Sequence, residues 1–337
     1  MREHGTAAAA LTALPEIAAK AGVSDYQICP EGVIHAEIKA ARKINARLIM
    51  IDDADYPTQL HDIDDAPPMF WTIGQEHMLR RPMVALVGAR NASSLGTRMT
   101  KRLAAELGEA GYVIVSGLAR GVDTAAHLGS IETGTIVVQA GGIDNVYPAE
   151  NAELAKQIAE KGLRLAEMPV GITPQARHFP ARNRIIAGLA QAVVVVEAAA
   201  KSGSLITAKN ALDQGRDVLA VPGHPFDARA AGGNMLIRDG AILVRSTADV
   251  IEALTPIAPA ASELPLCPPT ISKPRNLRES AKLHTEILAR LGPSPVAEDQ
   301  LIRDLQTAPS SVTPALMELE LDGKIIRQAG GLLARVS

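Results

Sequence analysis

Five segments of the sequence gather glycine, serine and arginine directly after runs of aliphatic residues. They are residues 88–96, 116–123, 141–144, 178–184 and 197–204. Glycine lets the backbone approach a ligand closely, and helix N-termini present unpaired N–H groups. Arginine and lysine add positive charge, and arginine can grip a phosphate with two donors. Together these segments predict a surface that binds phosphate groups.

Two arginines, Arg182 and Arg184, lie where the sequence predicts the start of a helix, at about residue 181. Positive charge at a helix N-terminus opposes the helix dipole, so the pair favours an anion-binding role. The alternative is structural, with one arginine in a salt bridge to Glu167 or Glu197.

Phe179 is one of only three phenylalanines in the chain. It precedes Pro180 and lies outside any periodic apolar run. Its ring either pins the entry to the helix as a hydrophobic staple or offers a surface on which a base stacks.

Several catalytic motifs are absent from the sequence. There is no Gly-x-x-x-x-Gly-Lys-Ser/Thr loop, no Gly-x-Gly-x-x-Gly after the first core strand, and no His-Glu-x-x-His or Gly-x-Ser-x-Gly. Asp123 and His127 are four residues apart on a predicted helix, but without a nucleophile nearby we interpret them as structural. Glu197 is interpreted as a carboxylate that accepts N–H bonds from the surrounding loops. We therefore expect neither ATP hydrolysis nor a classical nicotinamide cofactor.

The elements that must position these segments alternate regularly from residue 82. Strands are predicted at 84–87, 113–115, 136–139, 163–166, 193–196, 218–221 and 242–244, and helices at about 94–110, 121–131, 149–161, 181–190, 204–214 and 232–239. This alternation is typical of an α/β fold, a Rossmann-like doubly wound and mostly parallel sheet. In such sheets, ligands bind beyond the carboxyl ends of the strands.

The flanking regions follow other patterns. We expect a helical domain over 1–50, a connector rich in Asp and Pro over 51–81, the core over 82–254 and a Pro/Ala-rich linker over 255–279. Residues 280–337 read as three helices and a hairpin, the order of a winged helix. Its third helix is acidic, with Glu318, Glu320 and Asp322, so we expect it to contact protein rather than duplex DNA.

Composition limits the choice of function. The chain has 337 residues, 47% of them hydrophobic and only 2% aromatic, which favours an aliphatic sheet core over a platform of stacking rings. The net charge is -3, so any anion site must be local. The two cysteines, Cys29 and Cys267, have no metal-ligand neighbours and fit a reducing cytoplasm, and no stretch is apolar enough to span a membrane.

The core resembles the DNA processing protein A family, DprA, also called Smf. The resemblance spans roughly 56–245 and is carried by segments such as SGLARGVD (116–123), YPAEN (147–151), FPARNRIIAGL (179–189) and SGSLITA (202–208). It implies a single-stranded-DNA-binding mediator of natural transformation, which protects incoming strands and helps to load the RecA recombinase where single-strand-binding protein would block it. It also implies an extended Rossmann core that forms a homodimer, an N-terminal domain like a sterile alpha motif (SAM-like), a C-terminal winged helix and no catalytic activity.

The resemblance also implies a set of DNA-binding residues. Carried over to this sequence, they are Arg90, Ser116, Gly117, Arg120, Arg177, Phe179, Arg182, Asn183, Arg184, Lys201, Ser202, Gly203 and Ser204. The sequence departs from the family pattern after Pro222-Gly223, where it has His-Pro-Phe-Asp at 224–227, so this loop could be shaped differently.

Two other functions compete with this reading. A nucleotide phosphoribohydrolase-like enzyme could use the same kind of core, but the motif Pro-Gly-Gly-x-Gly-Thr-x-x-Glu of that family is absent. A transcription regulator could instead use residues 256–337 to bind duplex DNA.

Overall fold

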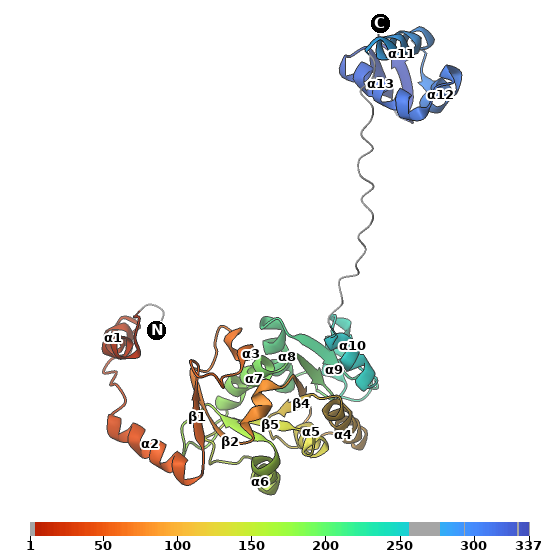
Figure 1. Cartoon of the computed structure of the whole chain (residues 1–337). Coiled ribbons are helices and arrows are strands. Elements are labelled where there is room, and N and C mark those ends of the chain that lie inside the picture. Colours follow the sequence, from red (N-terminus) through yellow and green to blue (C-terminus); the bar gives the residue numbers. More distant parts are fainter. Residues whose placement is uncertain (1–3, 256–276, 293, 329, 337) are drawn as a thin grey trace. The chain divides into compact units, whose positions relative to one another are not determined.

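The computed structural model describes residues 4–255, 277–292, 294–328 and 330–336. The chain divides into two compact units, Met1–Ile257 and Ala258–Ser337. Each unit is described by itself (Figure 1). The predicted linker over 255–279 falls almost entirely outside the described residues.

A nine-stranded sheet forms the centre of the first unit, in the order β1-β2-β6-β5-β4-β3-β7-β8-β9. Seven strands run parallel to one another: β3 (Met83–Val87), β4 (Val113–Ser116), β5 (Thr135–Gln139), β6 (Leu163–Ala166), β7 (Ala192–Val195), β8 (Asp217–Ala220) and β9 (Ile242–Leu243). At one edge, β1 (Arg47–Met50) pairs antiparallel with β2 (Met69–Gly74), and β2 pairs antiparallel with β6. The expected doubly wound, mostly parallel sheet is confirmed.

The strand order places a switch point between β3 and β7. From β3 the chain winds outward through β4, β5 and β6, and then returns to add β7 on the other side of β3. At such a point the two connections leave the sheet in opposite directions, which opens a crevice at the carboxyl ends of the strands.

Helices cover both faces of the sheet (Figure 1). Val84 and Leu86 of β3 pack with α4 (Ser94–Glu109), α5 (Val122–Ser130) and α10 (Thr247–Leu254). Ala85 and Val87 face the other side and pack with α3 (Thr58–His61), α7 (His178–Leu189) and α8 (Ser204–Asp213). The remaining helices of the core are α6 (Ala152–Lys161), α9 (Ala231–Arg238) and two short 3-10 turns, η1 (Glu76–Arg80) and η2 (Ala149–Asn151).

The N-terminal boundary differs from the prediction. The expected connector over 51–81 contains β2, where Phe70 and Trp71 are buried and pair with β1. Helix α2 (Glu31–Lys43) packs on this edge, because Ala41 contacts the Trp71 cluster and Glu37 accepts a hydrogen bond of 2.9 Å from the indole N–H. The sheet therefore begins at β1, before the predicted core. Helix α1 (Ala7–Lys20) buries no residue.

Helix α7 begins at His178, three residues before the predicted start. Pro180 therefore lies inside the first turn, where its missing N–H would have had no helical partner. As a result, Arg182 and Arg184 occupy the second turn of α7 rather than its N-terminus. This removes the dipole argument that favoured an anion beside them.

The second unit has the predicted order of a winged helix. It contains α11 (Leu277–Arg290), α12 (Glu298–Leu305) and α13 (Pro309–Leu321), with a sheet of β10 (Val296–Ala297), β12 (Leu332–Arg335) and β11 (Ile325–Gln328). Its core is aliphatic and includes Ile287, Leu301, Leu316 and Leu333. Strand β10 was not predicted.

Candidate functional site

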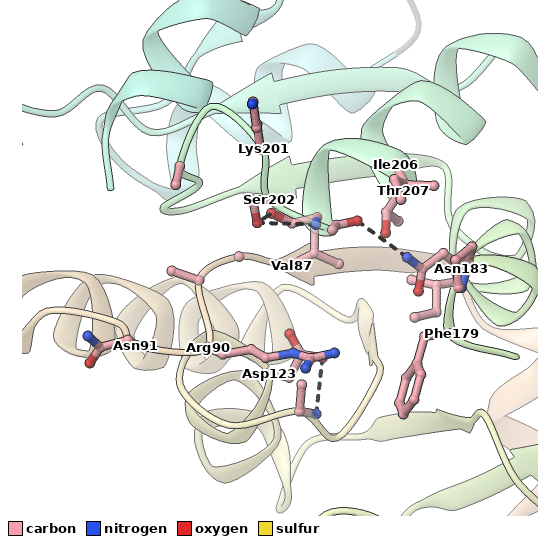
Figure 2. A pocket seen from close by; sticks show the side chains of 18 of the residues that line it. Val87, Arg90, Asn91, Asp123, Phe179, Asn183, Lys201, Ser202, Ile206 and Thr207 are labelled. Atoms are coloured by element: carbon pink, nitrogen blue, oxygen red, sulfur yellow. Dashed lines mark hydrogen bonds between the residues drawn. The ribbon is translucent and has the colours of Figure 1, made fainter. Parts of the chain in front are cut away.

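A cavity of about 460 Å³ lies at the switch point between β3 and β7 (Figure 2). Its walls are the loop after β3, the start of α7 and the loop that leads from β7 into α8. The lining residues are residues 87–91, Ala119, Asp123, Phe179, Pro180, Arg182, Asn183, Ile186, Ala199, residues 201–204, Ile206, Thr207 and Arg229. The structure thus brings eight of the thirteen predicted site residues to one cavity: Arg90, Phe179, Arg182, Asn183, Lys201, Ser202, Gly203 and Ser204.

Glu197 holds the loop after β3 in place. Its carboxylate accepts hydrogen bonds from the backbone N–H and the hydroxyl of Ser93, and Ser93 in turn accepts a bond of 2.9 Å from the N–H of Gly96 to cap α4. A Cβ at Gly96 would lie 2.5 Å from the Glu197 carboxyl carbon, so the contact requires glycine there. The interpretation of Glu197 as a loop tether is confirmed.

Asp123 and His127 are both structural. The Asp123 carboxylate accepts hydrogen bonds from the N–H groups of Gly117 at 3.1 Å and Ala119 at 3.2 Å, and burial raises its pKa. His127 is fully buried, lies 2.7 Å from the Thr135 hydroxyl through Nδ1, and has its pKa lowered to about 3 by burial. Each side chain is thus held by the fold, as predicted.

Arg182 lines the cavity, but its guanidinium is committed to the protein. It donates to the carbonyl of Gly117 at 2.8 Å and to that of Val138, and its charge lies near Asp123. Only 7% of the residue is exposed, and burial lowers its pKa to about 10. A Cβ at Gly117 would lie 2.4 Å from Nη1, so this glycine makes room for the guanidinium.

Arg184 forms the structural salt bridge that the sequence left open as the alternative. Its guanidinium holds Glu167 with two contacts of 2.6 and 3.1 Å and also reaches Asp65 at 3.1 Å. The side chain is only 16% exposed. Arg184 is absent from the lining because these carboxylates hold it elsewhere.

Four other predicted residues also lie outside the lining. The Ser116 hydroxyl is buried and donates to the Leu86 carbonyl at 2.7 Å, while Gly117 contributes the carbonyl that holds Arg182. Arg120 contacts Glu150 at 3.4 Å. Arg177 is exposed at the start of α7, beside the ring of His178. Ser116 and Gly117 therefore do not line the cavity, and Gly117 acts indirectly by holding Arg182 in place.

Arg90 and Lys201 are the cations of the lining whose side chains have neither an ion pair nor a hydrogen bond in the described part of the chain. Both are exposed. The Arg90 guanidinium carbon lies 5.5 Å from the centre of the Phe179 ring, a cation–π distance, and the Tyr147 ring lies 5.6 Å from Phe179 on a tilted plane. Figure 2 shows Arg90 and Phe179 on one side of the cavity and Lys201 on the other.

Sequence reasoning missed Arg229, Asn91 and Thr207, which also line the cavity. Arg229 comes from the loop after β8 and is held by Asp227 through contacts of 2.9 and 3.0 Å. Strand β8 pairs with β7, which brings the carboxyl ends of both strands to the same edge of the sheet. The sequence alone does not reveal this pairing, so it carried no signal for Arg229.

The lining carries excess positive charge. Four cations, Arg90, Arg182, Lys201 and Arg229, face a single carboxylate, Asp123. Asp123 offsets Arg182, and Asp227 offsets Arg229 from outside the lining. The field inside the cavity is thus set by Arg90 and Lys201, which favours a ligand that carries phosphate groups.

Similarity to known proteins points to one family. Residues 47–255 match the family model described as DNA recombination-mediator protein A. Residues 272–331 match a DprA winged helix domain, and residues 1–40 match a DprA-like N-terminal HHH domain, where the sequence suggested a SAM-like domain. Within the described residues, no helix is both long and apolar enough to cross a bilayer.

Individual relatives agree with the family match. Protein Smf of Synechocystis is 35% identical over 85% of this chain and 79% of its own length. DprA of Bacillus subtilis is 42% identical over 64% of this chain and 74% of its own length. The crystal structure of DprA from Streptococcus pneumoniae, 40% identical, superposes with a TM-score of 0.62 over 66% of this chain and 78% of that one. A structure of DprA from Helicobacter pylori, described for its single-stranded-DNA binding mode, is 29% identical. It superposes with a TM-score of 0.57 over 62% of this chain and 95% of that one.

Proposed function

This chain belongs to the DNA recombination-mediator protein A family (DprA, or Smf), and from that premise we propose that its cavity binds single-stranded DNA. The protein then acts as a recombination mediator in natural transformation. The observation that carries the proposal is a half-buried aromatic ring, Phe179, at the mouth of a cavity whose two unpaired cations are Arg90 and Lys201.

Each part of the cavity matches one part of a nucleotide. Arg90 and Lys201 offer charge to the phosphates, and the Phe179 ring offers a face to the base. Base–aromatic stacking contributes about 1–3 kcal/mol per base and tolerates any sequence. In duplex DNA, each base is already stacked and paired, so this arrangement favours single strands.

Binding fits the cavity better than catalysis does. Asp123 is the only carboxylate among the described residues that line the cavity. It accepts hydrogen bonds from two backbone N–H groups and lies near the charge of Arg182. A phosphoribohydrolase-like activity would require a free acid or base beside the ligand. We therefore propose a non-enzymatic role, in which the protein protects the incoming strand and needs no cofactor.

The wider role includes protein partners. We propose that the protein acts in the cytoplasm as a homodimer, hands its strand to the RecA recombinase and relieves the block by single-strand-binding protein. The winged helix suits a protein contact, because Met317 and Leu321 of α13 are 61% and 85% exposed and its acidic residues Glu318 and Glu320 would repel phosphates.

The test compares Arg90→Ala and Lys201→Ala with Arg102→Ala. Arg102 lies on α4 and pairs with Glu106 outside the cavity, so its loss makes the same change in net charge. Affinity for a fluorescent single-stranded oligonucleotide is measured by anisotropy between about 50 and 200 mM salt.

Each cavity variant should bind more weakly and flatten the slope of log K against log salt by about 0.7, the value for one phosphate contact on a single strand. Arg102→Ala should match the unmodified protein. Unchanged affinity in the double variant of Arg90 and Lys201 would contradict the proposed site.

A further inference from the structure

The side chain of Phe226 is almost completely exposed to solvent. It is 95% exposed, more than any other large hydrophobic residue in the described part of the chain. The protein has only three phenylalanines, and Phe70, by contrast, is completely buried in the core. Packing within the described part of the chain therefore gives no reason for an aromatic residue at position 226.

The loop that carries Phe226 is anchored at several points. Asp227 donates its N–H to the His224 carbonyl at 2.9 Å, and Phe226 donates its N–H to His224 Nδ1 at 3.3 Å. Gly223 exchanges two hydrogen bonds with the Asn234 side chain, at 3.1 and 2.9 Å. These bonds hold the loop in a turn, with the Phe226 ring on its outside.

The same turn reaches the cavity through Arg229. Asp227 holds the backbone N–H and the guanidinium of Arg229, and the Arg229 side chain lines the cavity. The Arg229 carbonyl also accepts the N–H of Ala198, just after β7, at 2.7 Å. Arg229 is three positions after Phe226, so their Cα atoms are at most about 11 Å apart.

A second ring lies beside Phe226. The ring centres of His224 and Phe226 are 5.5 Å apart with planes tilted by 41°. Both residues are exposed, and both follow β8 at the same edge of the sheet as the cavity. A flat, exposed ring next to a phosphate-binding cavity has the composition of a base-stacking site.

We propose that Phe226, flanked by His224, forms a second base-stacking site for single-stranded DNA that leaves the cavity past Arg229. This inference rests on the proposed function, because it requires a strand in the cavity. The strand places one base on Phe179, its phosphates pass Lys201 and Arg229, and a following base stacks on Phe226.

The test uses Phe226→Ala and Phe226→Leu in the full chain, with Leu212→Ala as the control. Leu212 is 59% exposed near the far end of α8, so its truncation also removes exposed apolar surface. Binding is measured with single-stranded oligonucleotides of about 4 to 16 nucleotides, over a range of salt.

Phe226→Ala should weaken binding of the longer oligonucleotides by about 5- to 150-fold. The salt slope should stay unchanged, because a neutral ring releases no counterions. Phe226→Leu should lose nearly as much, since an aliphatic side chain cannot stack. The shortest oligonucleotides, which fill only the cavity, should bind both variants normally.

Phe226→Trp supplies an independent readout. The protein has one tryptophan, Trp71, which is only 7% exposed, so a new exposed indole would dominate the change in fluorescence on binding. Stacking predicts quenching by long oligonucleotides and none by the shortest.

The inference and the function beneath it fail in different ways. If Phe226→Ala and Phe226→Leu bind every length within twofold of the unmodified protein while Lys201→Ala does not, the stacking site is overturned and the cavity stands. If Phe226→Leu binds normally and only Phe226→Ala is weak, the residue makes an apolar contact rather than a stack. If the unmodified protein binds no single strand, both proposals fall.

Discussion

Arg182 and Arg90 line the same cavity, yet they should respond to substitution in opposite ways. Arg182→Met keeps the length of the side chain and removes the guanidinium. The carbonyls of Gly117 and Val138 then lose their donor, and Asp123 loses its neighbouring cation. Arg90→Ala removes an exposed guanidinium whose one side-chain contact, among the residues that the structure describes, is with the Phe179 ring.

The magnitude follows from what is left unpaired. A buried polar group without a partner costs about 1–3 kcal/mol. In Arg182→Met two buried carbonyls lose their donor, and the Asp123 carboxylate loses a nearby opposite charge. The cost at Asp123 is reduced, because its carboxylate keeps the hydrogen bonds from two backbone N–H groups, so the separate costs do not simply add. We expect Arg182→Met to lower the free energy of unfolding by about 3–5 kcal/mol, Arg182→Lys by less, and Arg90→Ala by under about 0.5 kcal/mol.

The assay is urea denaturation with linear extrapolation, run beside the oligonucleotide titration. The pH dependence adds a second check. Burial raises the pKa of Asp123 and the charge of Arg182 opposes that rise, so removing Arg182 raises this pKa further. The folded state then holds a proton that the unfolded state releases, so the variant loses stability as pH rises. Its deficit should be larger at pH 8 than at pH 5.

One outcome would refute this reasoning. If Arg182→Met unfolds within about 1 kcal/mol of the unmodified protein but loses as much DNA affinity as Arg90→Ala, then Arg182 is a ligand of the DNA and not a structural cation.

Two further predictions concern stability. Burial lowers the pKa of His127 from 6.5 to about 3, so as pH falls the unfolded state binds a proton before the folded state does. The free energy of unfolding should therefore decline from about pH 6.5 towards pH 3. In His127→Gln, denaturation measured across this range should show a weaker dependence on pH, and an unchanged dependence would show that His127 is not responsible. Gly96→Ala places a Cβ 2.5 Å from the Glu197 carboxyl carbon, so it should lower the free energy of unfolding by about 1–3 kcal/mol and weaken oligonucleotide binding by displacing the loop after β3. Gly32→Ala is the control, because Gly32 lies on α2 outside the cavity and a Cβ there would meet nothing within 4 Å. Equal stability of the two variants would contradict the tether.

The sequence predicted the central sheet well, because its strands are aliphatic runs buried on both faces. It failed at β2, where aromatic residues follow an Asp- and Pro-rich stretch and the strand pairs antiparallel at the edge. It also could not supply the order of the strands. That order creates the switch point and brings Arg229 from the loop after β8 to the cavity.

Within the site, residue type alone could not separate binding arginines from structural ones. Arg90, Arg182 and Arg184 all follow core strands and were all predicted to bind DNA. Tertiary contacts separate them: Gly117 leaves room for the Arg182 guanidinium, and Glu167 meets Arg184 from the end of β6. Only Arg90 keeps its charge free for a ligand.

The most direct measurement of the central claim is the affinity of the unmodified protein for one oligonucleotide as a single strand and as a duplex, at about 50 and 200 mM salt. A cavity with two free cations and a stacking ring predicts tighter binding of the single strand at both salt concentrations, weakening as salt rises, with little dependence on sequence. Tighter binding of the duplex, or binding of the single strand that does not respond to salt, would contradict it.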